Sequence, residues 1–139
     1  MCYFVAAYIN DSVDANDFEG LCKGLGFNPG RIEGYLGFPK IRGFYAYHLT
    51  GGICDCGTPI GSDDEARWQD LQPYVDLVNS VSTLKRIKSL MFLKHMDSWG
   101  ETLTDLDYET IHIDDFYREV LLEAEVDIIY KIQYYKRYL

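Results

Sequence analysis

The sequence predicts a single α+β domain over residues 1–139, with a mixed or antiparallel sheet of about five strands and three helices. Three observations support this prediction. The length of 139 residues is near the usual size of one domain. Apolar residues make up 47% of the chain and aromatic residues 15%, which is enough for a core. Segments with the period of a strand alternate with segments with the period of a helix, and no internal repeat or low-complexity stretch interrupts them.

The first half of the chain is predicted to contain two strands and one helix. Residues 2–9 are apolar on both faces, as expected of a central strand. Asp14 is placed as the N-cap of a helix that ends near Gly26, because apolar side chains recur between them at helical spacing. Residues 27–42 are interrupted by Gly and Pro and are predicted to be irregular. The second strand is expected over 44–49.

The longest helix is predicted next. Ser62 and Glu65 have the spacing of a capping box, and apolar positions continue to about Arg86, with a kink expected at Pro73. A third, mostly buried strand is expected over 88–96.

The last quarter of the chain is predicted to form strand, helix and strand. A short strand is expected over 108–113, and a helix that begins at Asp114 or Asp115 is expected to continue to Ala124. Residues 126–134 alternate between apolar and polar side chains, which predicts the final strand. The predicted element order is therefore β-α-β-α-β-β-α-β.

The net charge of −9 is concentrated in one segment. Residues 97–127 hold eleven acids and one base, whereas the rest of the chain has eleven acids and twelve bases. A strongly acidic surface steers basic partners toward it and disfavours direct nucleic-acid binding. One hypothesis is therefore a small acidic protein that binds, and by mimicry inhibits, a basic partner such as a nucleic-acid-binding protein. The candidate contact residues are Asp105, Asp107, Glu109, Glu119 and Glu123.

The acidic segment has two other interpretations. Asp105, Asp107 and Glu109 occur at every second position, so in an extended segment they share one face and could bind a hard cation. The plainer interpretation is a solvated acidic face that keeps the protein in solution.

Cys54 and Cys56 lie two residues apart in a glycine-rich loop, and this is the sharpest local feature of the sequence. Two such thiols can share a zinc ion, which needs further ligands. His48 and Cys2 are the candidates, and Cys2 can take part only if the first two strands run antiparallel. A second hypothesis is a reactive thiol with His48 as its base, in a thiol- or zinc-dependent enzyme. A third hypothesis is that the thiols only pack in the fold and neither bind a metal ion nor react.

The remaining features restrict the function without identifying it. Nucleotide-binding and serine-hydrolase motifs are missing, which favours a binding protein over an enzyme. Cys22 and His95 are predicted to be core residues, and His112 to point outward. No apolar run approaches the roughly 20 residues of a membrane span, and the N-terminus lacks the pattern of a secretory signal. We therefore expect four reduced thiols and a cytoplasmic location.

Overall fold

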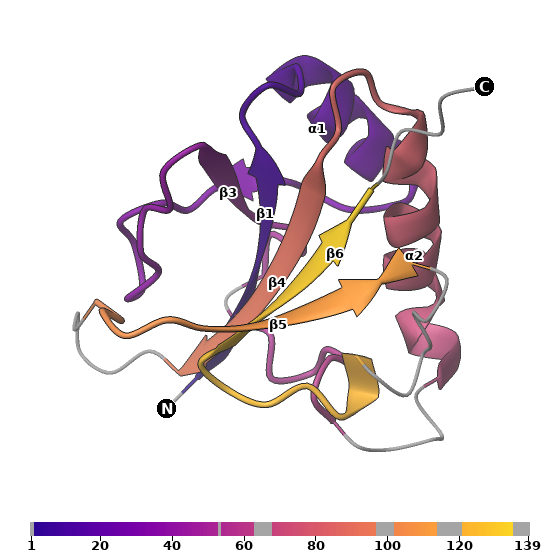
Figure 1. The fold of residues 1–139 in the computed structure, drawn as a ribbon. Helices are drawn as coiled ribbons and strands as arrows, with labels where there is room; N and C mark the ends of the chain where they lie inside the picture. The colour runs from indigo at the N-terminus through magenta and orange to yellow at the C-terminus, as the bar shows by residue number, and fades with distance from the viewer. Residues whose placement is uncertain (1, 53, 63–67, 97–101, 114–120, 135–139) are drawn as a thin grey trace.

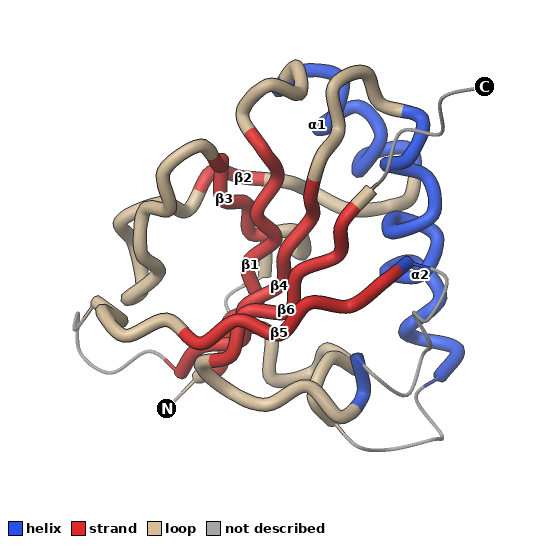
Figure 2. Tube along the Cα trace, in the orientation of Figure 1, coloured by secondary structure: helices blue, strands red, loops and turns tan. Residues whose placement is uncertain are grey.

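A computed structural model describes residues 2–52, 54–62, 68–96, 102–113 and 121–134. It shows one six-stranded sheet with two helices, so the predicted α+β class is confirmed (Figures 1 and 2). In chain order the elements are β1 (Tyr3–Asn10), α1 (Ala15–Gly24), β2 (Gly30–Arg31), β3 (Phe44–His48), α2 (Trp68–Ser80), the 3₁₀ helix η2 (Val81–Thr83), β4 (Ser89–Met96), β5 (Asp107–His112) and β6 (Ile128–Gln133).

The sheet is mixed, and its spatial order is β2-β3-β1-β4-β6-β5. Strand β1 lies in the middle and runs antiparallel to both β3 and β4. Strand β6 is antiparallel to β4, whereas β5 runs parallel to β6 and forms an edge of the sheet. The sixth strand, which the sequence does not predict, is the two-residue β2 beside β3. It falls in the segment 27–42 that is predicted to be irregular.

Two α-helices occur in the described residues, rather than the three predicted. Helix α1 begins as expected, because the Asp14 side chain accepts a hydrogen bond from the Asp17 backbone N–H at 3.0 Å. Helix α2 contains Pro73 and is followed directly by η2, which shortens the predicted helix at its C-terminal end. The predicted third helix falls mostly on 114–120, outside the described residues, as does Glu65 of the predicted capping box.

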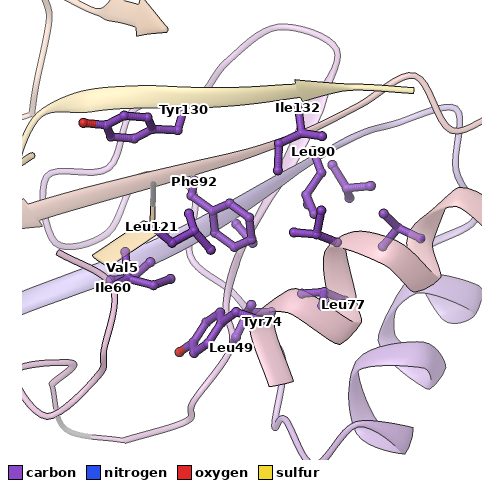
Figure 3. Close-up of a cluster of buried hydrophobic side chains, with 14 of the residues drawn as sticks. Val5, Leu49, Ile60, Tyr74, Leu77, Leu90, Phe92, Leu121, Tyr130 and Ile132 are labelled. Atoms are coloured by element: carbon purple, nitrogen blue, oxygen red, sulfur yellow. The ribbon is translucent and has the colours of Figure 1, made fainter. Parts of the chain in front are cut away.

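One face of the sheet packs against both helices. Phe18 and Cys22 of α1, which are fully buried, join the same core as Leu77 of α2 and Phe92 of β4. Figure 3 shows this core between the sheet and α2, with side chains such as Ile132 and Leu90 above and Tyr74 and Leu77 below. The prediction that Cys22 is a core residue is confirmed.

The other face of the sheet is covered by irregular chain. Phe38, from the segment between β2 and β3, packs on Phe4, Tyr8 and Met91. The Tyr8 hydroxyl donates a hydrogen bond to the Pro39 carbonyl at 2.8 Å, and burial raises the pKa of this phenol. Because both of its faces are covered, β1 is buried from Phe4 to Asn10.

The antiparallel pairing of β1 with β3 decides where the candidate site forms. In this pairing Ala6 lies opposite His48. The start of β1 therefore lies beside the end of β3 and the loop that follows it. None of the helices in the described part of the chain has both the length and the apolar character needed to cross a membrane.

Candidate metal centre

The loop after β3 is attached to β1 through Asp55, a residue that is only 2% exposed. Its Oδ2 accepts a hydrogen bond from the Val5 backbone N–H at 2.7 Å and lies 2.7 Å from His48 Nε2. Its Oδ1 accepts a hydrogen bond from the Thr50 hydroxyl at 2.6 Å. The Asp55 backbone N–H also donates to the Tyr3 carbonyl at 2.7 Å. A buried carboxylate needs such a full set of donors, so these contacts fix the position of the loop.

The residues on either side of Asp55 are the two loop cysteines, and the loop brings both of them to Cys2. The sulfur atoms of Cys2, Cys54 and Cys56 all lie within 4.8 Å of one another. The Tyr3 backbone N–H donates to Cys56 Sγ at 3.3 Å, which helps to orient that sulfur. The antiparallel pairing of β1 with β3, on which a role for Cys2 depends, is present.

Three sulfurs at this spacing can hold one metal ion. In a tetrahedral site with zinc–sulfur bonds of about 2.3 Å, neighbouring sulfurs are about 3.8 Å apart. That separation lies within the 4.8 Å limit on the distances in this group. The trio comes from two segments about fifty residues apart in the chain, which distinguishes it from a chance pair of neighbouring thiols.

His48 does not belong to the converging group, although the sequence suggests it as a ligand. Its Nε2 is held by the Asp55 carboxylate and lies 3.1 Å from Thr50 Oγ1. The ring therefore supports the loop rather than the sulfur cluster. These contacts occupy Nε2 of the imidazole, so a base role in the reactive-thiol hypothesis would fall to Nδ1.

The sulfur atoms are not chemically equivalent. The pKa of the Cys54 thiol is lowered, chiefly because its sulfur accepts a hydrogen bond from the Cys56 backbone N–H, and further because the thiols of Cys56 and Cys2 donate to it. The pKa of the Cys2 thiol is raised, because its hydrogen bond to Cys54 favours the protonated form. Of this pair, Cys54 is therefore the thiol that loses its proton at the lower pH. By contrast, burial raises the pKa of Cys22 to about 12.

Lys94 of β4 interacts electrostatically with Cys56 of the cluster. Its ammonium group lies 4.7 Å from the centre of the Tyr3 ring. Burial lowers the pKa of Lys94, while the negative charge of Cys56 acts in the opposite direction.

The acidic residues gather at the β5 edge of the sheet. Asp107 and Glu109 are exposed on β5, and Asp105 is exposed just before it. Glu123 is exposed too, and it lines a hollow of about 280 Å³ together with Glu109, Glu125 and Tyr130. Glu119, the remaining predicted contact residue, lies outside the described residues. Among the residues that the structure describes, none of these acids belongs to a group spaced for a metal ion.

The other two histidines lie as expected. His95 is 6% exposed, and its Nδ1 is 2.6 Å from Asp127 Oδ1, which confirms a hydrogen-bonded core histidine. His112 is exposed at the end of β5.

Asp55 is the important residue that the sequence analysis did not identify. The available signal was its position between two cysteines, shortly after a strand that ends in His48 and is followed by Thr50. An acid in such a place is able to accept hydrogen bonds from its own loop.

Comparison with known proteins gave no match, either to a protein-family model, to a curated protein or to a solved structure.

Replacing Asp55 with Ala is predicted to lower the free energy of unfolding by about 2–4 kcal/mol, because buried donors of Val5, Thr50 and His48 lose their acceptor. Urea denaturation followed by circular dichroism measures this change. Replacing the exposed Asp11 with Ala is the matched control and should have little effect. Equal stability of the two variants would contradict the role given to Asp55.

Cys54 and Cys2 are half-buried to a similar degree, so their alkylation rates compare their pKa values. Because the pKa of Cys54 is lowered, its rate with iodoacetamide should rise through a midpoint below the ordinary thiol value of about 8.5, and the midpoint of Cys2 should lie above it. Short pulses at a series of pH values, followed by peptide mass spectrometry, give both midpoints. Cys22 should stay unmodified while the protein is folded. The reverse order of the two midpoints would refute the assignment.

Proposed function

We propose that the protein binds a zinc ion through the thiolates of Cys2, Cys54 and Cys56. The convergence of these three sulfurs within 4.8 Å supports the proposal. Thiolates are preferred ligands of zinc. Because these thiols must stay reduced, we place the protein in the cytoplasm.

The number of ligands suggests what the ion does. Zinc prefers four ligands in a tetrahedral arrangement, and the described residues supply three sulfurs. In our proposal the fourth position is taken by water or by an exogenous ligand. A three-ligand site of this kind is chemically open, whereas a purely structural zinc site is closed by four protein ligands.

Zinc also stabilises the fold in this proposal. The ion joins the start of β1 to the loop after β3, two segments that the unfolded chain does not hold together. Binding energy at such a site contributes to the free energy of folding. Because protons compete for the thiolates, affinity falls as the pH falls.

The purified reduced protein is predicted to bind one zinc ion per chain. Cys54→Ser, Cys56→Ser and Cys2→Ser should each lose most of the affinity, whereas Cys22→Ala, which changes a thiol of the helix core, should keep the stoichiometry. Competition with a chromophoric chelator measures binding. With free zinc at about 100 times Kd, the free energy of unfolding should increase by about 2.7 kcal/mol.

Two results would contradict the zinc proposal. One is a stoichiometry that stays the same when Cys54 and Cys56 are both replaced with Ser. The other is cobalt substitution without the thiolate-to-metal charge-transfer absorption that sulfur ligands produce.

A second candidate function rests on the acidic β5 edge, and it is association with a basic protein partner. Asp105, Asp107, Glu109 and Glu123 are all exposed, and the last two share a hollow with Tyr130. Like charges on one edge produce a field that accelerates the approach of a basic partner and weakens with added salt. In this proposal the partner is a protein that normally holds nucleic acid, and nucleic acid itself is not bound.

Replacing Asp107, Glu109 and Glu123 with Asn, Gln and Gln is predicted to weaken binding to a lysine-rich polypeptide and to flatten the salt dependence of its Kd. The probe is poly-lysine, titrated at several salt concentrations by fluorescence anisotropy. A control variant replaces the exposed acids Asp11, Asp14 and Asp17 near α1 with Asn, which removes the same charge elsewhere. Equal losses in the two variants would indicate a general charge effect and would count against a dedicated acidic face.

A further inference from the structure

A groove of about 720 Å³ lies on the helix side of the sheet, at the end where β1 begins. It is lined by Tyr3 of β1, Lys94 of β4, Gly61 and the segment 122–126. Its volume is within the roughly 300–1,000 Å³ of sites that bind small molecules. Neither the zinc proposal nor the acidic-edge proposal uses this groove as a binding site.

The ammonium group of Lys94 lies in the wall of this groove, where it contacts two backbone carbonyls and the Tyr3 ring. The residue is half-buried, and its Nζ contacts the carbonyl oxygens of Ile60 and Gly61 at 3.3 and 3.5 Å. Both contacts are longer than the usual hydrogen bonds of about 2.7–3.2 Å. Among the residues that the structure describes, no carboxylate forms an ion pair with Lys94. A partly desolvated ammonium group in this state favours an anionic ligand.

The other residues that line the groove determine which chemical groups the ligand needs besides an anionic one. Glu123 and Glu125 are exposed acids in the lining of the groove, so they repel ligands with several negative charges and attract a cationic group. The ring of Tyr3 and the side chain of Val126, which is 40% exposed, offer apolar surface. The groove therefore matches a ligand with one carboxylate, one ammonium group and an apolar body.

We propose that this groove binds a short peptide with free ends, whose carboxylate lies on Lys94 and whose ammonium group lies at Glu123 and Glu125. A peptide with free ends carries both of these charges, whereas a simple anion carries only the negative one. Apolar side chains of the peptide pack against Tyr3 and Val126.

The walls of the groove are tied together, so the site is formed before the ligand arrives. The Gly61 backbone N–H donates to the Leu121 carbonyl at 2.7 Å, and the Asp127 backbone N–H donates to the Lys94 carbonyl at 2.8 Å. Gly61 has φ +72°, and a Cβ atom at this position would be 2.5 Å from the Ala124 carbonyl oxygen. Glycine is therefore required where the two walls meet, and such preorganisation favours binding.

The probe for this proposal is the dipeptide leucyl-leucine, titrated to millimolar concentrations into the reduced, metal-free protein. Backbone ¹H–¹⁵N spectra should show saturable shifts at Tyr3, Gly61, Lys94 and 122–126. Two ligand analogues test the charges separately. The C-terminal amide lacks the carboxylate and should bind at least about tenfold more weakly, and the N-acetyl derivative should lose affinity through its missing ammonium group.

In Lys94→Met, the affinity for leucyl-leucine is expected to fall to the affinity that the unmodified protein has for the C-terminal amide of leucyl-leucine. Lys131→Met is the matched control, because Lys131 lies on neighbouring β6 between residues of the helix-side core and therefore projects from the opposite face of the sheet. Its affinity should equal that of the unmodified protein. The proposal fails if leucyl-leucine and its amide bind the unmodified protein equally, or if no shifts occur at these residues. Because metal-free protein is used, the zinc proposal is not affected by either outcome.

Discussion

The carboxylate of Asp55 is enclosed by the protein, and a charge in that position is tolerated only because donors from several segments converge on it. The start of β1 contributes the Val5 backbone N–H, the end of β3 contributes His48, and the loop contributes its own Thr50. Sheet pairing places these segments near one another, but pairing alone does not orient the loop. The hydrogen bonds of Asp55 provide that orientation, and the sulfur cluster depends on it, since Cys54 and Cys56 are its immediate neighbours.

Strands β1, β3, β4 and β6 were predictable because each buries one or both faces, and this burial leaves a pattern of apolar residues that a short stretch of sequence reveals. The segments expected at 2–9 and 88–96 differ from β1 and β4 by a residue or two at their ends. Strand order has no such local signal. The sequence therefore left the role of Cys2 dependent on whether β1 and β3 pair antiparallel, and the structure shows that they do. His48 was placed correctly at the end of a strand, but its partner is Asp55 rather than a metal ligand set.

Features that depend on contacts between separate segments, rather than on the pattern of residues within one segment, could not be predicted from the sequence. Strand β2 has only two residues and exists because β3 pairs with it, so no periodicity reveals it. The gathering of Glu109, Glu123 and Glu125 around Tyr130 depends on the parallel alignment of β5 with β6. Acidic side chains on an edge strand also discourage backbone pairing with a strand of another chain. They do not hinder a basic partner that binds through side-chain contacts.

The separation of Cys2 from Cys54 and Cys56 in the chain has a consequence during synthesis. Cys2 leaves the ribosome well before its two partners, and at about 5–20 residues per second the delay lasts several seconds. Throughout this interval Cys2 is an isolated thiol. Strand β4, the second neighbour of β1, is made later still. The three sulfurs of a nascent chain can therefore come together only after the loop that follows β3 has been made and β3 has paired with β1.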